Sequence, residues 1–281
     1  MYQDESLEIA SEQYPLTNET LALLGKRFST RNFAESTRES SAIADQEKDT
    51  ILKAALRAPT AGNLLAYSIL DIVDEGRKEQ LALLCDDQPF VARAPFALVF
   101  VADYQKWADM FRAADCARHI ANGTVTTPDA QEAPGLGSLM LGINDAVIAA
   151  QNAVIAAESL GIGSCYIGDI MEKGPQIAEL LELPQYTFPA AFVVFGRAKK
   201  ALQPTSHFCK NAVMQNSYQR LEGAKLEQHI QEITEWAPSS RMNETLATYP
   251  EAVFVRKHTS VFMADMNESV RWWIDRWCAH E

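Results

Sequence analysis

The chain has 281 residues, of which 47% are hydrophobic and 22% are charged, and its formal net charge is −12 at pH 7. This length and apolar content suffice for a large core, in one elaborated domain or in one domain with an extension. The negative charge argues against a nucleic-acid partner, because such binding depends on Lys and Arg neutralising phosphates. An acidic N-terminus and the absence of an obvious membrane-spanning run predict a soluble, cytoplasmic protein with no membrane partner.

The five cysteines are odd in number and scattered along the chain, unlike the framework of a secreted disulfide-rich protein. Reduced thiols in a reducing compartment are therefore expected. Neither the segment 116–119 nor the segment 207–209, each with one Cys and one His, has a common zinc-ligand spacing. The sequence thus predicts no metal site.

Hydrophobic periodicity predicts a mixed α+β order. The expected helices cover residues 18–26, 46–57, 76–84, a segment after Asp103, 144–160 and 175–183, and the expected strands cover 67–73, 96–101, 164–168 and 188–196. Residues 122–137 are rich in Gly, Pro and Thr and are expected to form a long loop, where functional residues are common. From about Leu221 the sequence becomes polar and charged before a final amphipathic segment.

Arg27, Ser29 and Arg31 form the first candidate binding segment. In extended backbone, side chains alternate between two faces, so these three project together while Phe28 and Thr30 project to the other side. Guanidinium groups bind phosphate oxygens through paired, charge-assisted hydrogen bonds, and a hydroxyl adds a donor. The pattern fits a phosphate clamp, and an exposed basic loop without a ligand is the alternative.

The second candidate is the turn formed by Thr60, Ala61, Gly62 and Asn63. Pro, Gly and Asn end the preceding helix in a turn. Asn63 offers both an acceptor and donors, which is the pattern that pairs with the alternating carbonyl and N–H groups on the edge of a flavin pyrimidine. A purely structural turn role for Asn63 explains the residue equally well.

The third candidate follows the GxG segment at 161–163. A dinucleotide-binding fingerprint needs a strand before the glycines and a helix after them, but here the order is reversed, which excludes a Rossmann unit. The glycines instead allow a flat ring to approach the backbone of Tyr166, Ile167 and Gly168, with amides near Gly168 and Asp169 as donors. Together the three segments predict a site for flavin mononucleotide (FMN).

The order of these segments resembles the nitroreductase family, and more closely its oxygen-insensitive, NADPH-dependent nitroreductase and flavin reductase branch. The resemblance runs from about Leu21 to Tyr218, and the chain from Ala264 onward looks like the C-terminal extension of that branch. It is carried by Lys26-Arg27-Phe28-Ser29-Thr30-Arg31-Asn32-Phe33, the 58–63 turn, Gln88-Pro89-Phe90-Val91-Ala92, Gln151-Asn152-Ala153, residues 156–163 and Tyr166-Ile167-Gly168.

The resemblance implies a nitroreductase-like α+β fold, with a central, mostly antiparallel sheet flanked by helices. It implies an FMN-binding domain over residues 17–220, and a helical extension over 221–281 that packs on the body or on the partner subunit. It also implies a homodimer with two sites at its interface, with FMN as cofactor and NADPH or NADH as electron donor. A ping-pong mechanism would pass two electrons to a small aromatic or quinone-like acceptor.

Site residues follow from the resemblance by position. The phosphate and ribityl groups would lie against residues 27–31, the pyrimidine edge against residues 60–63, and the isoalloxazine along residues 166–169. Phe28 stands where a polar or basic residue is usual, and His207 or Lys210 takes the place of a late basic pair. Asp169 stands where a second glycine is common, and its side chain either faces the flavin, points to solvent or caps residues 171–173. No side chain is assigned as a catalytic acid or base.

Two segments bear on assembly. In the predicted helix 144–160 the polar residues fall in pairs seven positions apart, so they form one narrow stripe on an otherwise apolar helix. Such a helix fits either a monomer core or, as the resemblance implies, a dimer interface. Three tryptophans within 272–277 are expected to dock on the body or partner; gating of the flavin pocket is the alternative.

These features predict an FMN-dependent oxidoreductase that transfers electrons from NAD(P)H to nitroaromatics, quinones or flavins. A flavin-dependent dehalogenase, an ene-reductase or a flavin-degrading relative would use the same site for another reaction. A flavin-binding protein without efficient turnover is an alternative from a different functional class.

Overall fold

The computed structural model describes residues 18–34, 42–125, 127, 131–200, 211–238, 241–243 and 245–279. The chain divides into two compact units. The first comprises Met1–Pro204 with Glu268–Glu281, and the second comprises Thr205–Asn267. The candidate site residues within the described ranges all belong to the first unit.

A four-stranded antiparallel sheet forms the centre of the first unit. Its strands are β1 (Tyr67–Asp71), β2 (Phe96–Asp103), β3 (Gly163–Ile167) and β4 (Thr187–Gly196), in the spatial order β1-β2-β4-β3. The two central strands are buried on both faces over most of their length, as their nearly continuous apolar sequences require. The α+β prediction is confirmed, and β3 lies at an edge of the sheet.

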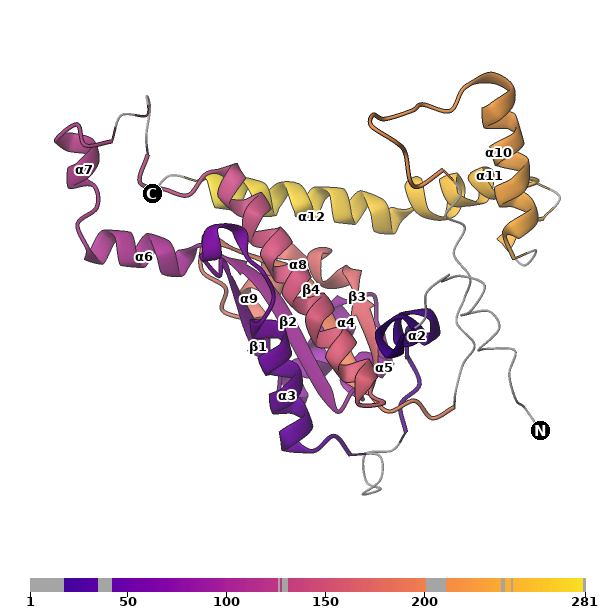
Figure 1. Ribbon diagram of the computed structural model, residues 1–281, viewed down its shortest axis with the longest axis horizontal. Helices are drawn as coiled ribbons and strands as arrows, with labels where there is room; N and C mark the ends of the chain where they lie inside the picture. Colours follow the sequence, from indigo (N-terminus) through magenta and orange to yellow (C-terminus); the bar gives the residue numbers. More distant parts are fainter. Residues whose placement is uncertain are drawn as a thin grey trace. The chain divides into compact units, whose positions relative to one another are not determined.

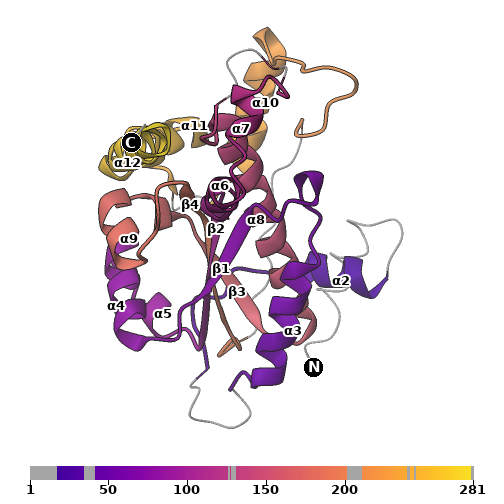
Figure 2. The ribbon, with the colours of Figure 1, turned by 90° about the vertical axis from the view of Figure 1, so that its left-hand side faces the viewer.

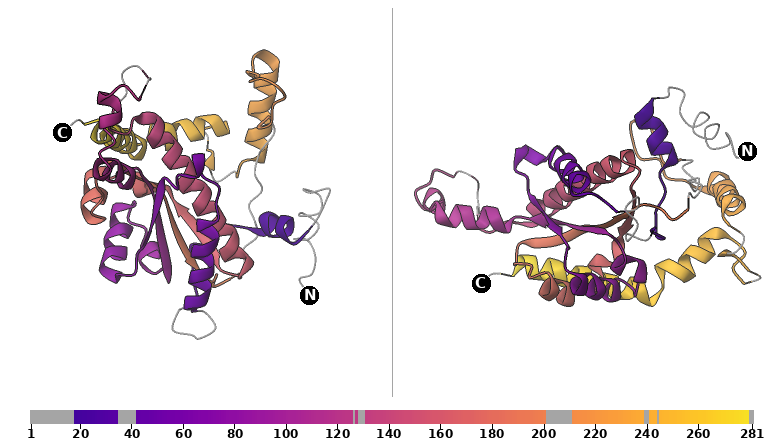
Figure 3. Two further views of the ribbon diagram at one scale, coloured as in Figure 1. Left: turned by 60° about the vertical axis from the view of Figure 1, so that its left-hand side comes forward. Right: turned by 90° about the horizontal axis from the view of Figure 1, so that it is seen from below.

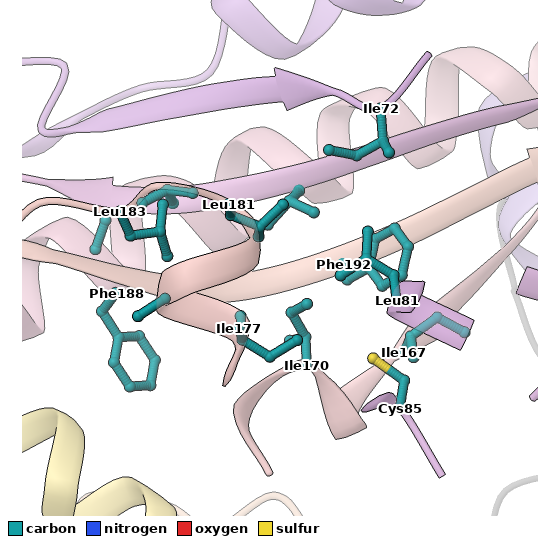
Figure 4. Packing of buried hydrophobic residues seen from close by; sticks show 14 of the residues in the cluster. Ile72, Leu81, Cys85, Ile167, Ile170, Ile177, Leu181, Leu183, Phe188 and Phe192 are labelled. Carbon is teal, nitrogen blue, oxygen red and sulfur yellow. The ribbon is translucent and has the colours of Figure 1, made fainter. Parts of the chain in front are cut away.

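Helices cover both faces of this sheet (Figures 1 and 2). One face carries α3 (Asp45–Leu56) and α8 (Leu136–Ser159), and the other carries α4 (Glu75–Leu84), α5 (Pro89–Ala92) and α9 (Gly174–Leu180). Each interface has its own apolar cluster. Figure 4 shows part of the cluster between the sheet and helices α4, α5 and α9, where Cys85 from the end of α4 lies near Ile167 from the end of β3.

Other helices of the first unit lie outside these two layers. Helices α6 (Gln105–Ala113) and α7 (Arg118–Ala121) extend beyond the end of the sheet, and the short α2 (Glu19–Lys26) precedes the first candidate segment (Figure 3). The second unit contains α10 (Gly223–Trp236), α11 (Tyr249–Val253) and a π-helical turn, η4 (Phe254–His258). The resemblance implied a helical extension over residues 221–281, without bounds for its individual helices.

Helix α8 differs from its prediction at the N-terminal end, because it begins at Leu136 instead of Asn144. Gly137 and Gly142 lower the helix propensity of this first part, but burial of Leu139 and Gly142 against the body outweighs propensity. By length and composition α8 could cross a membrane, contrary to the expectation that the chain has no such run. In the structure it packs along the sheet, as the core helix of a globular domain does.

Helix α12 (Val261–Cys278) begins in the second unit and ends in the first, where Trp273 and Trp277 are each only 2% exposed. Trp273 packs edge-on against Phe188, and the Trp277 indole donates a 2.8 Å hydrogen bond to the carbonyl of Pro134. Gly174 makes this packing close, since a Cβ there would lie 2.7 Å from the Trp272 ring. The tryptophan-rich end of the chain is therefore part of the first unit's core.

Candidate functional site

The first candidate segment lies beside edge strand β3. Ser29 forms a parallel bridge with Ser164, and the Thr30 N–H donates a 2.8 Å hydrogen bond to the Ser164 carbonyl. Two glycines paired across β3 and β4, Gly163 and Gly196, make room for this approach. A Cβ on Gly163 would overlap Thr30, and a Cβ on Gly196 would overlap the Phe33 ring. The sheet edge is thus shaped to receive the segment.

The three polar side chains of the predicted phosphate clamp all affect the pKa of one residue of this strand, Cys165. Burial raises the pKa of the Cys165 thiol, whereas Arg31, a hydrogen bond with Ser29 and Arg27 each oppose that rise. Arg27 and Ser29 are half-buried and Arg31 is exposed. The structure therefore brings all three to the same stretch of β3. Phe28 is half-buried between them in sequence and supplies no hydrogen-bonding side chain.

Arg27 also faces two side chains at the C-terminal half of α8 and on β3. Burial raises the pKa of Glu158, partly offset by a 3.2 Å hydrogen bond from the Ser164 hydroxyl and by Arg27. Burial likewise raises the pKa of Tyr166 to about 12, with Arg27 opposing it. The Tyr166 hydroxyl donates to Gln151 Oε1 at 3.2 Å. Arg27 therefore lies near enough to Glu158 and Tyr166 for its charge to act on both.

The backbone after β3 is open and firmly held. Ile167 and Ile170 are buried on either side of Gly168 and Asp169, which begin the 3₁₀ turn η2 (Gly168–Met171). A Cβ on Gly168 would meet no atom within 4 Å. The backbone at Gly168 is consequently open to the approach of a flat ring.

Asp169 has a partner that the sequence did not indicate. Its Oδ2 accepts a 2.9 Å hydrogen bond from Gln88 Nε2, and the same nitrogen donates at 2.8 Å to the Cys85 carbonyl. Asp169 is half-buried, its carboxylate binds Gln88, and the Glu172 N–H bonds to its main-chain carbonyl, so whether the carboxylate faces a bound flavin stays a prediction. Gln88 thus ties the Asp169 carboxylate to the start of α5.

The Thr60–Asn63 turn lies at the other end of α8. It contains the 3₁₀ turn η1 (Ala61–Asn63), and the Ala61 N–H donates a 2.9 Å hydrogen bond to Asp145 Oδ1. Gly62 and Asn63 have positive φ angles of 58° and 57°. Asn63 is exposed, and its carboxamide makes no hydrogen bond within the described residues. It therefore presents both its donor and its acceptor to the outside.

The structure assembles the candidate residues into two groups. Residues 27–31 and 166–169 lie together around β3, whereas the Thr60–Asn63 turn joins α8 near Asp145. Thirteen residues separate Asp145 from Glu158, which corresponds to about 20 Å along the helix. His207 and Lys210 lie outside the described residues.

Three residues near the site were not predicted to act there: Gln88, Asp145 and Glu158. Gln88 lies in one of the segments that carry the family resemblance, but no role was assigned to it there. Its partner, Asp169, is 81 residues away in the sequence. Asp145 and Glu158 were assigned to a polar stripe on α8. A lone carboxylate among alanines and valines was the available signal for Asp145, because a buried charge requires a specific partner.

A separate pocket of about 930 Å³ lies at α6, α7 and the turn before β4. Its lining includes Phe111, Arg112, Cys116, His119, Gln185 and Tyr186. It contains none of the predicted cofactor-binding residues. Within the described ranges, no three His, Cys, Asp or Glu side chains are grouped closely enough to bind a metal ion.

Comparisons with known proteins agree with this architecture. An FMN reductase (NADPH) from Bacillus subtilis is 30% identical over 202 residues, covering 72% of this chain and 75% of the relative. An oxygen-insensitive NADPH nitroreductase from Salmonella typhimurium is 30% identical over 237 residues, covering 83% and 89%. The solved structure of nitroreductase A from Vibrio parahaemolyticus superposes with a TM-score of 0.71 at 25% identity, covering 92% of this chain and 98% of that one.

The predicted nitroreductase-like fold is confirmed by this superposition. The model of the family described as "Nitroreductase family" matches residues 24–197, which include the described cofactor-binding candidates on β3 and on the Thr60–Asn63 turn. The chain belongs to the nitroreductase family.

Proposed function

We propose that this protein is an FMN-dependent oxidoreductase that uses NADPH or NADH to reduce nitroaromatics, quinones or flavins. The observation that carries the proposal is the convergence of Arg27, Ser29 and Arg31 on β3, directly before the open backbone at Gly168. This places cationic and hydroxyl donors next to a surface fit for a flat ring. The names of the relatives, an NADPH-dependent FMN reductase and an NADPH nitroreductase, support the same chemistry.

The donor set fits a flavin phosphate. Arg27 and Arg31 supply positive charge in a chain whose net charge is −12, and Ser29 adds a hydroxyl. The Thr30 hydroxyl, next to them in sequence, is buried and makes no hydrogen bond in the described part of the structure. We assign the phosphate to residues 27–31, the ring to residues 166–169 and the pyrimidine edge to residues 60–63.

Bound FMN would accept a hydride from the nicotinamide and deliver two electrons to the acceptor in a ping-pong cycle. The protein's own residues would bind and orient the cofactor. Arg27 and Arg31 neutralise the phosphate, Asn63 offers a matched donor and acceptor, and the main chain at Gly168 and Asp169 donates at the ring. Tyr166 is a neutral phenol at physiological pH, as its ordinary pKa of 10 already ensures, and burial raises that pKa further, to about 12.

We further propose a homodimer with α8 at its interface. Leu136, Met140, Leu141, Val147 and Ile148 form an exposed, mostly apolar stripe along α8 that the exposed Asn144 and Gln151 interrupt, although other faces of the same helix are buried. Exposed apolar stripes of this kind are typical of subunit contacts. Antiparallel pairing of two α8 helices would bring the Thr60–Asn63 turn of one copy toward residues 27–31 and 166 of the other. This would unite the two groups that a single chain keeps apart.

A reducing, cytoplasmic location is part of the same proposal. It is supported by four free thiols, Cys85, Cys116, Cys165 and Cys278, in the described part of the chain.

Spectroscopy of the purified protein tests the proposed function. A flavin absorbance spectrum that NADPH or NADH bleaches without oxygen, and that a nitroaromatic or quinone then restores, is the expected result. Bleaching without restoration by any of these acceptors would contradict the proposed acceptor class. A protein that binds FMN but is not reduced would be a flavin-binding protein without turnover.

A further inference from the structure

We propose that Asp145 is a positioning residue for the cofactor, because its buried carboxylate holds the Thr60–Asn63 turn in a strained, ligand-ready shape. The inference rests on the proposed function, which assigns the pyrimidine edge of FMN to this turn. Asp145 itself contacts no assigned ligand group. Its role would be exerted through the Ala61 N–H, which donates to Asp145 Oδ1 at 2.9 Å.

Helix α8 holds the turn at two points on one face. Gly142 and Asp145 are both buried and lie three residues apart, so they project from the same side of the helix. A Cβ on Gly142 would lie 3.0 Å from the Ala66 carbonyl oxygen and 3.2 Å from the Ala102 Cβ. The chain just after the turn is therefore pressed against the helix at Gly142, and the start of the turn is bound at Asp145.

The backbone between these two points is strained. Gly62, Asn63 and Leu65 have φ angles of 58°, 57° and 48°, and the left-handed region is unfavourable for a leucine. Such conformations persist only where surrounding contacts enforce them. The Leu65 N–H donates to the Thr60 hydroxyl at 3.2 Å, and the Trp107 indole donates to the Leu64 carbonyl at 3.1 Å. The hydrogen bond from the Ala61 N–H to Asp145 is the corresponding contact at the start of the turn.

Asp145 is costly as a purely structural residue. It is 2% exposed, and its Oδ2 is buried without a hydrogen-bond partner in the described part of the structure. An unsatisfied buried carboxylate oxygen destabilises the fold, and an apolar side chain of similar volume would pack there at lower cost. Its charge also acts on Tyr67, whose pKa is raised by burial and by Asp145. Among the described residues, the hydrogen bond that offsets this cost is the one from the Ala61 N–H of the turn.

Three variants separate positioning from general stability. In Asp145→Asn the amide oxygen still accepts from the Ala61 N–H, whereas Asp145→Ala removes the acceptor. Asn152→Ala is the matched control, because Asn152 lies on the same helix and donates a 3.2 Å hydrogen bond to the Ala54 carbonyl, away from the turn. For each, hydrogen exchange of residues 60–66 is measured in the apo-protein, and FMN affinity is measured by fluorescence titration.

Asp145→Ala is expected to accelerate exchange in residues 60–66 and to weaken FMN by about tenfold or more, the scale of one hydrogen bond to a charged group. Asp145→Asn and Asn152→Ala should keep FMN affinity within about threefold of wild type. Unchanged exchange and affinity in Asp145→Ala, or an equal loss in Asn152→Ala, would overturn the role. If the alanine variant is insoluble, a tenfold loss in Asp145→Asn would overturn it. A wild-type protein that binds no FMN would refute the proposed function instead. The hydrogen-exchange data would still test whether Asp145 holds the Thr60–Asn63 turn.

Discussion

The main-chain N–H of Thr30 donates a 2.8 Å hydrogen bond to the carbonyl oxygen of Ser164. This bond attaches the segment that carries Arg27 and Arg31 to the edge strand that leads to Gly168. It forms only because Gly163, the residue before Ser164, has no Cβ to overlap Thr30. The geometry of the proposed phosphate clamp thus depends on a glycine more than 130 positions away in the sequence.

Gly163→Ala should therefore weaken FMN binding. The added methyl group would push the Thr30 segment away from β3, and overpacking of this kind costs about 1–3 kcal/mol. Gly137→Ala is the control, because a Cβ there meets no atom within 4 Å. Fluorescence titration of the apo-proteins measures the effect. Equal FMN affinity in both variants would mean that the clamp does not need this contact.

Arg27→Ala should weaken FMN by about 1.5–3 kcal/mol, the range for a hydrogen bond to a charged group. Arg271→Ala removes the same charge from an exposed position on α12 and should leave the affinity unchanged.

The same variants can be followed by ultraviolet titration of tyrosine. Because Arg27 opposes the rise in the pKa of Tyr166, that pKa should move further upward in Arg27→Ala only.

A different consequence concerns stability and pH. Burial raises the pKa of Glu158 above its ordinary 4.5, so the folded protein keeps this proton at pH values where the unfolded chain has lost it. The contribution of Glu158 to the free energy of unfolding therefore falls as pH rises from about 4.5 through the folded-state pKa. Glu158→Gln removes this titration. Urea unfolding across that window should show a smaller loss of stability with rising pH in the variant than in wild type, and parallel curves would disprove the assignment.

The candidate site could be proposed from the sequence where local rules decide the structure. The alternation of Arg27, Ser29 and Arg31 follows from extended backbone, and the glycines after α8 indicate an open backbone. The partners of Asp145, Gln88 and Glu158 could not be predicted, because each is brought into contact by folding across the sheet or along α8. The early start of α8 at Leu136 was missed for a related reason, since tertiary burial stabilises a helix whose glycines disfavour it.

The proposed dimer can be tested on the exposed stripe of α8. Ile148 is 40% exposed in the single chain, so Ile148→Asp should leave the monomer folded while placing a charge in the subunit contact, at a cost of several kcal/mol. Val73→Asp is the control, at a position that is 76% exposed after β1. Sedimentation equilibrium should give dimers for wild type and Val73→Asp and monomers for Ile148→Asp, with loss of FMN in the last. A wild-type monomer at micromolar concentration would refute the interface.

Asp169 offers the most direct test of how the protein tunes its cofactor. The carboxylate is held by Gln88 next to the backbone assigned to the flavin ring, and a negative charge there disfavours added electron density. Asp169→Asn keeps an oxygen that can accept from Gln88 but removes the charge. The midpoint potential of bound FMN should then rise by a few tens of millivolts, since about 1.4 kcal/mol corresponds to about 30 mV for a two-electron couple. Asp87→Asn removes an equal charge from an exposed position and should change the potential much less. If redox titration gives the same potential for wild type and Asp169→Asn, the carboxylate serves only to join η2 to α5, and the main-chain amides alone act on the ring.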